Sequence, residues 1–322
     1  MTFRRNFLAF LGAHAAVVFS PTSAQSRYPN RPIKFIVPFP PGGNIDFVAR
    51  AIAQPMGQAL GQPVLIDYKP GADGLIAGEV VAKSSPDGYT FMFGGSTGMS
   101  FAPAAHKSMP YDVLTDFTPV GRIGTVGFFV YVHADVPAKT FAELVSYARA
   151  NPGKLHYGSG NATSMVTTAQ ITKANKMDMV HIPYKGDAPL FLDIVAGRVQ
   201  VAVGSGVALP FVQDGKLRAL ATLMANRSPL LPDVPTLVET GMPEIPNVPW
   251  SGLFGPAKLP REVTDRVSRE LSQVLTRSDV REQLGKVAFE CHTSSPEELA
   301  TLAKDQLAIW AKASRDAGVW PE

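Results

Sequence analysis

The chain has 322 residues, with 30 Lys or Arg against 27 Asp or Glu. At roughly 100–200 residues per domain, this length predicts two domains. The nearly balanced charge argues against a nucleic-acid partner, because nucleic-acid-binding proteins carry a basic patch. The single cysteine, Cys291, excludes an internal disulfide, so the hydrophobic core must stabilise the fold. Residues 287–291 have the pattern of a strand, and we do not expect Cys291 to be a nucleophile.

The N-terminus has the pattern of an export signal. Arg4 and Arg5 precede an apolar run over residues 7–19, and the sequence then reaches Ala24, a small residue that suits signal peptidase. The run is too short to span a bilayer, which takes roughly 20 residues. We therefore predict that residues 1–24 are a signal peptide. The arginine pair fits a twin-arginine signal and also an ordinary Sec signal, so the export route stays open.

Strand-like and helical patterns alternate along the chain, which predicts an α/β protein with parallel sheets of βαβ units. Helical patterns cover residues 141–150 and 189–196. Pro260 and Pro296 each begin a further helix with one apolar face, carrying Val263, Val267, Leu271 and Val274 in the first and Leu299, Leu302 and Trp310 in the second. The predicted strands are 63–68, 89–93, 128–132, 179–183, 199–203 and 217–222.

The stretch 33–46 carries the clearest local signal. It predicts a buried strand, a rigid Pro-Pro-Gly-Gly turn and the start of an amphipathic helix. Glycines at 42 and 43 let a bound group approach the main chain, and the free N–H groups of the first helical turn favour an anion. A turn of this kind also serves packing alone, and from the sequence both interpretations stay open.

A hydrolase is the competing function. Residues 94–98 match G-x-S-x-G after a predicted strand, as a nucleophile elbow with Ser96 would. An amphipathic helix should follow directly, yet Pro103 and the lack of an apolar period over residues 99–105 argue against one. The sequence offers no histidine partner, and it shows no closely spaced metal-ligand set. We therefore expect no catalytic residue, no metal and no cofactor.

Many ordered motifs of this chain, from Tyr28 to about Gly318, resemble the Bug-type solute receptors of tripartite tricarboxylate transporters. The motifs that carry the resemblance are Tyr28-Pro29-Asn30-Arg31-Pro32-Ile33, Pro38-Phe39-Pro40-Pro41-Gly42-Gly43 with Asp46 and Arg50, Leu60-Gly61-Gln62-Pro63-Val64, Lys69-Pro70-Gly71-Ala72, Ser85-Pro86-Asp87-Gly88-Tyr89-Thr90, Asp116-Phe117-Thr118-Pro119-Val120, Pro152-Gly153-Lys154-Leu155, Ile182-Pro183-Tyr184-Lys185-Gly186, Gly215-Lys216-Leu217-Arg218 and Leu231-Pro232-Asp233-Val234-Pro235-Thr236.

This resemblance implies a two-lobed, type II-like periplasmic-binding-protein (Venus-flytrap) fold with two crossing strands. Lobe one is predicted over residues 27–126 and 253–322, and lobe two over 127–252, with crossings near 128–132 and 250–254. The family implies a non-enzymatic, monomeric periplasmic receptor that captures a small carboxylate-bearing solute. Its implied partners are the membrane permease subunits of a tripartite tricarboxylate transporter. A sensor role that feeds a histidine kinase stays open, and the sequence does not identify the ligand.

The family pattern also implies which loops line the cleft. The first lobe would contribute the loop from Phe39 to Asp46 and the segment ending in Ser96 and Thr97, and the second lobe would contribute the loop from Gly158 to Ser164 with nearby residues of the next helix. In the family, backbone N–H groups, hydroxyls and waters hold one carboxylate. The predicted site residues are Phe39, Pro40, Gly42, Gly43, Asn44, Asp46, Ser96, Thr97, Gly158, Ser159, Asn161, Thr163, Ser164, Tyr184, Lys185 and Asp193.

The second-lobe loop departs from the usual family pattern, Gly-Ser-x-Gly-x-Gly-Ser-x-x-His-Leu. Asn161 and Thr163 replace glycines, and Thr167 stands where histidine is usual. For Asn161 we expect a turn residue with positive φ, whereas the role of Thr163 stays open. Lys185 either pairs with an anion or lies on a solvated face. Two aspartates have structural alternatives: Asp46 capping its helix, and Asp193 pairing across the cleft mouth.

Overall fold

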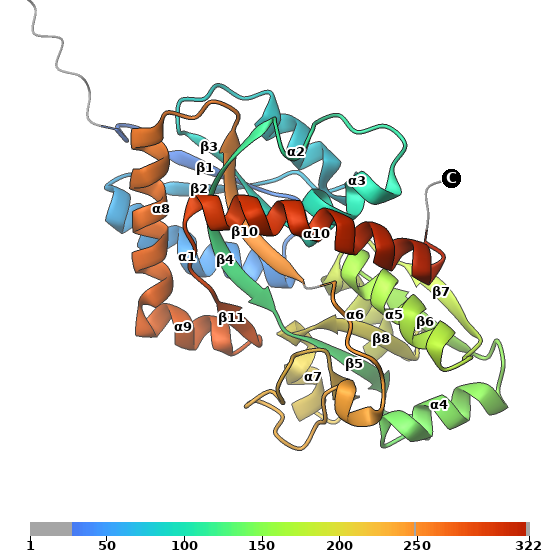
Figure 1. The fold of residues 1–322 in the computed structure, drawn as a ribbon. Helices are drawn as coiled ribbons and strands as arrows, with labels where there is room; N and C mark the ends of the chain where they lie inside the picture. The colour runs from blue at the N-terminus through green and yellow to red at the C-terminus, as the bar shows by residue number, and fades with distance from the viewer. Residues whose placement is uncertain (1–27, 248, 320–322) are drawn as a thin grey trace, which may run out of the picture.

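Two mixed β-sheets, each with helices packed on its faces, form the protein (Figure 1). The computed structural model describes residues 28–247 and 249–319, so the predicted signal peptide lies outside the described residues. The first sheet has the order β11-β4-β10-β3-β1-β2, and the second has the order β7-β6-β8-β5-β9. The strands are β1 (Ile33–Val37), β2 (Val64–Tyr68), β3 (Thr90–Gly95), β4 (Phe117–Val126), β5 (Phe128–His133), β6 (Leu155–Ser159), β7 (Met179–Pro183), β8 (Val201–Ser205), β9 (Leu217–Thr222), β10 (Trp250–Pro256) and β11 (Phe289–Cys291).

The helices follow the apolar periods of the sequence. A capping box at Ser295 and Glu298 begins the longest helix, and Gly318, with a φ of 75°, ends it. Among the described residues, no helix is long and apolar enough to cross a membrane. The α-helices are α1 (Asn44–Leu60), α2 (Leu75–Ala82), α3 (Ala102–Ala105), α4 (Phe141–Ala150), α5 (Ala162–Ala174), α6 (Asp187–Val195), α7 (Leu209–Gln213), α8 (Arg261–Thr276), α9 (Ser278–Gly285) and α10 (Pro296–Ala317), with short helical turns η1 (Ala72–Gly74), η2 (Thr97–Phe101), η3 (Gly206–Ala208) and η4 (Val238–Thr240).

Most predicted elements are confirmed, and β7, β9 and α4 have the predicted bounds. The prediction of purely parallel sheets is wrong. β1 runs parallel to β2 and β3, but β10 is antiparallel to both β3 and β4. In the second sheet β5 is antiparallel to β8 and β9. β5 and β10 each enter their sheet from the other sheet rather than through a βαβ crossover. The strands β4 and β6 were not predicted.

The chain passes between the two sheets twice. β4 and β5 are separated only by Gly127, whereas a long connection after β9 leads back to the first sheet and reaches β10 at Trp250. All of β5 therefore pairs in the second sheet, and all of β10 in the first, so both crossings lie just outside the ranges predicted for them. The sequence placed residues 250–252 in the second lobe, but these residues pair with β3 and β4.

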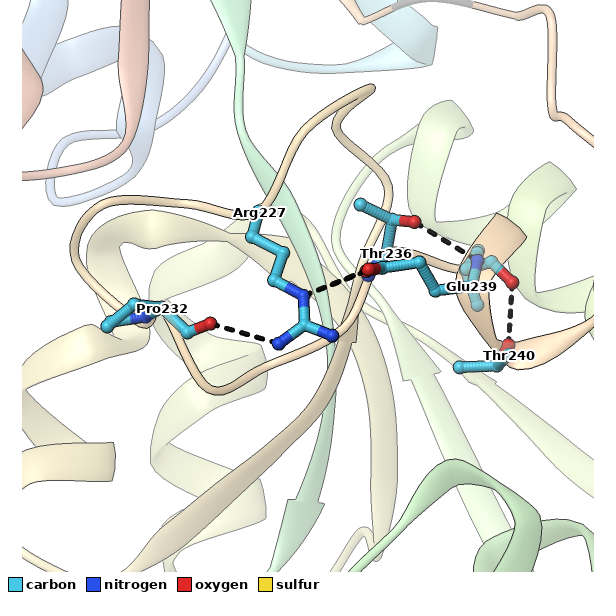
Figure 2. A network of polar contacts seen from close by, with 6 residues as sticks. Arg227, Pro232, Thr236, Glu239 and Thr240 are labelled. Atoms are coloured by element: carbon cyan, nitrogen blue, oxygen red, sulfur yellow. Dashed lines mark hydrogen bonds and ion pairs between the residues drawn. The ribbon is translucent and has the colours of Figure 1, made fainter.

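A long connection brings the chain from β9 back to β10, and polar contacts between its own residues hold it together (Figure 2). A parallel bridge joins Thr222 to Thr236. Within the connection the Nε of Arg227 donates to Glu239 at 3.0 Å, and its Nη1 donates to the carbonyl of Pro232 at 3.2 Å. The backbone N–H of Glu239 donates to the Thr236 hydroxyl at 3.1 Å. These contacts give an otherwise irregular segment a fixed path back to the first sheet.

Helix α10 lies across both halves of the molecule (Figure 1). Its first turns place Leu299 in the core of the first sheet, whereas Trp310 packs on Phe101 and on Ala162 and Val166 at the start of α5. Trp310 and Phe101 meet edge to face, with ring centroids 6.1 Å apart. The helix therefore joins the two halves through an apolar contact far from the crossing strands.

The first testable prediction concerns the passage at Gly127. The backbone nitrogen of Gly127 donates to the carbonyl oxygen of Ala288 at 2.8 Å, and a Cβ at 127 would lie 2.4 Å from that oxygen. The oxygen belongs to the backbone and has little room to move. Gly127→Ala should therefore lower the free energy of unfolding by about 1–3 kcal/mol, measured by denaturant unfolding. Gly285→Ala is the control, because a Cβ at 285 meets no atom within 4 Å. Equal effects of the two substitutions would contradict the prediction.

Candidate functional site

A cavity of about 60 Å³ lies between the two sheets. The crossing strands form its floor, with Val126 and Phe128 on one passage and Pro249 and Trp250 on the other. Its walls are the loops that follow β1 and β3 on one side and the beginnings of α5 and α6 on the other. The predicted site residues that line it are Phe39, Pro40, Gly43, Asn44, Ser96, Thr97, Asn161 and Thr163.

The N-terminus of α1 opens onto this cavity. Gly43, Asn44 and Ile45 line the cavity, and no side chain caps the helix. The N–H groups of a first helical turn have no partner within the helix, and together with the helix dipole they attract an anion. Asn44 is only 4% exposed, yet neither polar atom of its side-chain amide has a hydrogen-bond partner. A buried amide without partners is costly in a folded protein, and a bound polar solute would satisfy it.

Asp46 holds the loop from behind rather than lining the cavity. Its Oδ2 accepts from the backbone nitrogen of Gly42 at 2.8 Å, and its Oδ1 accepts from Arg50 Nε at 2.7 Å and from the Tyr68 hydroxyl. The N–H group of Gly42 is therefore not available to a ligand, and Gly42 itself has a φ of 90°. Burial raises the pKa of Asp46, but the hydrogen bonds from Gly42, Tyr68 and Arg50 outweigh burial and lower the pKa overall.

The second wall is built at the starts of α5 and α6. Asn161 has a φ of −164° and caps α5 by accepting from the Ser164 nitrogen at 3.0 Å, so the expected positive φ is wrong. Asparagine is suited to this place because its side-chain oxygen satisfies a first-turn N–H group. The Thr163 hydroxyl lies 3.5 Å from the Ser96 hydroxyl, so the pair joins the two walls. The sequence left the role of Thr163 open, and the structure places this residue in the cavity wall.

Three predicted residues of the loop after β6 do not line the cavity. Gly158 is a packing residue, since a Cβ there would lie 2.1 Å from Leu190. The hydroxyl of Ser159 lies 2.7 Å from Nε2 of His181, whose pKa is lowered by burial. Ser164 is fully buried, and its hydroxyl has no hydrogen-bond partner. None of these three is among the residues that line the cavity.

The remaining predicted residues lie away from the cavity. Tyr184 donates its hydroxyl to Asp193 at 2.8 Å, and Arg198 donates to the other carboxylate oxygen at 2.7 Å. The interpretation of Asp193 as a pair across the cleft mouth is therefore wrong, because its partners belong to the same half. These hydrogen bonds from Arg198 and Tyr184 lower the pKa of Asp193. Lys185 is exposed to solvent.

Residues that the sequence did not nominate for the site also line the cavity, foremost Asp187, Ser205 and Trp250. Asp187 begins α6 directly after Gly186 and is 6% exposed. The sequence signal available for it was its position at a helix start beside a glycine. Trp250 was noted only for its place near a crossing. It is 1% exposed, and its indole Nε1 has no hydrogen-bond partner.

The nucleophile elbow is not assembled around Ser96. A helical turn does follow β3, as η2 and then α3, so the expectation that none follows is wrong. Ser96 has φ −50° and ψ −38°, an ordinary helical conformation rather than a strained turn. Its hydroxyl faces Thr163, and no histidine is among the cavity-lining residues in the described part of the chain. The described cavity wall therefore lacks the histidine that a nucleophile elbow uses as its base. Burial also raises the pKa of Cys291, which lies in β11.

Comparison with known proteins agrees with this architecture. The family model for the tripartite tricarboxylate transporter family receptor matches residues 48–318. The chain belongs to this receptor family. Protein BugT of Bordetella pertussis is 32% identical over 323 residues, which cover 97% of each chain. The resemblance to Bug-type receptors is thereby confirmed.

Solved receptor structures share the whole fold. The periplasmic binding protein BugD superposes with a TM-score of 0.87 at 31% identity, covering 92% of this chain and all of BugD. The R. palustris protein Rpa4515, solved with adipate, gives a TM-score of 0.88 at 31% identity with the same coverage. The two-lobed α/β binding-protein fold is confirmed, and this receptor is a periplasmic solute-binding protein of the family.

The Asp46 contacts predict a pH-dependent contribution to the receptor's stability. A carboxyl whose folded pKa is lowered contributes stability above its unfolded pKa of about 3.9, and the contribution is lost as pH falls through the folded pKa. Asp46→Asn should therefore lower the free energy of unfolding at pH 7 by about 1–3 kcal/mol, with the gap narrowing below about pH 4. Asp67→Asn, which removes the partly exposed pair with Lys69, should change little. If the difference in the free energy of unfolding between the wild type and Asp46→Asn does not change with pH, this role of Asp46 is disproved.

Trp250 predicts an optical signal for ligand binding, because it lines the cavity at the second crossing. The intrinsic fluorescence of the receptor should change on titration with its solute, and Trp250→Phe should lose most of that change. Trp310→Phe is a matched control, because Trp310 is equally buried but does not line the cavity. The sequence assigned Trp310 little part in closure, yet it packs between α10 and α5, so a partial loss is expected. If Trp250→Phe keeps the full fluorescence change on titration with the solute, Trp250 does not lie beside the ligand. Trp320 lies outside the described residues.

Proposed function

We propose that this receptor captures a small carboxylate-bearing solute between its two lobes and delivers it, as a monomer, to the permease of a tripartite tricarboxylate-type transporter. The lobes would be the two sheets with their helices, divided at Gly127 and between Pro249 and Trp250. The predicted export signal would bring the chain to the periplasm, where the permease is accessible. The observation that carries the proposal is a cavity between the sheets whose lining includes Asn44, a residue with a buried side-chain amide that has no hydrogen-bond partner.

The two lobes touch around the cavity mouth, which supports capture by closure. A Cβ on Gly42 would lie 3.3 Å from the Cβ of Ala188, and a Cβ on Gly186 would lie 3.1 Å from Pro40. The loop before α1 therefore lies against Gly186 and Ala188 at the start of α6, with Gly42 facing the Ala188 side chain and Gly186 facing the Pro40 ring. Glycines at these places allow the approach, and larger residues would hold the lobes apart.

The donors that line the cavity suit a single carboxylate. The first turn of α1 has N–H groups without a side-chain cap, and two lining residues, Asn44 and Trp250, carry a buried amide and a buried indole N–H without partners. Preorganised donors bind an anion without the cost of ordering long charged side chains. Waters could bridge the remaining distance without weakening the site. Rpa4515, with its bound adipate, supports a carboxylate as the ligand class. We propose binding without catalysis, because Ser96 faces Thr163 rather than a base.

Gly43→Val tests the proposal directly. Gly43 has φ −91°, so the backbone accepts a side chain, but its Cβ would point at the Cβ of Asp187, 3.9 Å away. The valine methyl groups should enter the cleft and abolish binding while the fold stays intact, whereas Gly43→Ala should have a mild effect. A panel of carboxylates is screened by thermal unfolding and calorimetry, since a ligand at 100 times its dissociation constant stabilises the fold by about 2.7 kcal/mol.

Two results would contradict the proposal. If no carboxylate stabilises the wild-type receptor, the ligand class is wrong. If Gly43→Val keeps full affinity, the loop before α1 does not hold the ligand. A joint loss of stability and binding in Gly43→Val would instead make Gly43 a packing residue, and thermal unfolding without ligand distinguishes that case.

A further inference from the structure

The cavity is chemically unequal on its two sides. Each side has an uncapped helix start, that of α1 on the first-lobe side and that of α6 on the second-lobe side. The first-lobe side also has two lining residues with buried polar atoms that have no partner, the amide of Asn44 and the indole N–H of Trp250. The second-lobe side has Asp187, a carboxylate that is 6% exposed. No lysine, arginine or histidine is found among the described residues that line the cavity. A ligand must therefore satisfy hydrogen-bond donors at one end of the cavity and a buried carboxylate at the other. No basic side chain in the described cavity wall neutralises that carboxylate.

Two neutral groups fix the carboxylate of Asp187. Asn161 Nδ2 donates to Oδ1 at 3.0 Å, and the Ser205 hydroxyl donates to Oδ2. Both donors leave further lone pairs on the oxygens, because each carboxylate oxygen accepts about two hydrogen bonds. Burial raises the pKa of Asp187, and the hydrogen bonds from Ser205 and Asn161 oppose that rise. The side chain is therefore held by two hydrogen bonds, and its oxygens keep further acceptor capacity in a residue that lines the cavity.

The second carboxylate that lines the cavity, that of Asp73, is more exposed than Asp187 and has a histidine partner. Asp73 lines the cavity from the first lobe, but its Oδ2 lies 3.0 Å from His106 Nε2, and its side chain is 40% exposed. Solvent and a histidine partner offset its charge. Asp46 is satisfied by Gly42, Arg50 and Tyr68 and does not line the cavity. Asp187 is therefore the one lining carboxylate, within the described part of the chain, that is both buried and paired only with neutral donors.

We propose that Asp187 makes this receptor selective for carboxylates that also carry a hydrogen-bond-donating cationic group, that is, for small amino carboxylates over unsubstituted dicarboxylates. This inference rests on the proposed function, since the ligand carboxylate would lie at the α1 end. A second ligand carboxylate at the far end would face Asp187 and be repelled, whereas an ammonium group would gain a charge-assisted hydrogen bond. Like charges in a weakly solvated site are a strong basis for rejecting the wrong ligand.

The test compares three ligand sets of matched length by calorimetry at pH 7. They are ω-amino carboxylates, unsubstituted monocarboxylates and dicarboxylates with chains of three to six carbons. In the wild-type receptor the best amino carboxylate should bind about 10- to 100-fold more tightly than the dicarboxylate of equal length. Asp187→Asn keeps the size of the side chain and removes the charge; its oxygen can still accept from Asn161, and its new NH2 group can donate to the Ser205 hydroxyl if that hydroxyl turns. The preference should fall below about threefold or reverse.

Two further variants keep the test interpretable. Asp187→Ser offers a short polar helix-start residue if the asparagine variant folds poorly, and it should lose the same preference. Asp214→Asn removes an exposed charge elsewhere in the second lobe and should leave the ranking unchanged. Thermal unfolding without ligand shows that each variant is folded.

The outcomes separate the two proposals. If carboxylates bind but the wild type prefers dicarboxylates, or if Asp187→Asn keeps the wild-type ranking, the role of Asp187 is overturned and capture of carboxylates stands. If no ligand of the three sets binds the wild type, the proposed function fails as well. Loss of the amino-carboxylate preference in both Asp187 variants, with the Asp214→Asn ranking unchanged, supports the assignment.

Discussion

The close packing of backbone at the passage between the two sheets is the constraint on which the rest of the structure depends. The nitrogen of Gly127 bonds to the carbonyl of Ala288, and the nitrogen of Val126 bonds to the carbonyl of Pro249, so three separate segments meet there. Val126 and Pro249 also form part of the floor of the cavity. These backbone hydrogen bonds fix the segments that connect the two walls of the cavity.

Helix starts, rather than long charged side chains, give the cavity its electrostatic character. α1 and α6 both begin at the cavity with glycines at their N-caps, and neither has a side-chain cap. The lobes can therefore approach within ordinary contact distance of each other, which a lysine or arginine at the same places would prevent. Because the donors belong to rigid elements, little conformational entropy is lost on binding. The cavity stays small, and its polarity depends on a few fixed groups.

Two aspartates illustrate how the same residue type acquires opposite roles. Asp46 lies in the first turn of α1 and Asp187 in the first turn of α6. Asp46 has a cationic partner and two further donors behind the loop, and its pKa is lowered. Asp187 has only neutral donors and is buried beside the ligand space, and its pKa is raised. The first aspartate fixes the shape of the loop, and the second is left with charge that a ligand must complement.

The sequence by itself determined the element types, the binding-protein family and the first-lobe loop, because these follow from local patterns: apolar periods, Pro and Gly at helix ends, and motif order. The loop residues Gly43 and Asn44 were found in this way. It did not determine the direction of the crossing strands or the orientation of the side chains on the second wall. Asp187 and Asp193 lie on one helix, six positions apart, yet one lines the cavity and the other binds Arg198 and Tyr184. That choice depends on how α6 packs against the second sheet, and on which side chains, such as Asn161 and Ser205, distant segments bring beside it. Only the tertiary structure decides such long-range contacts.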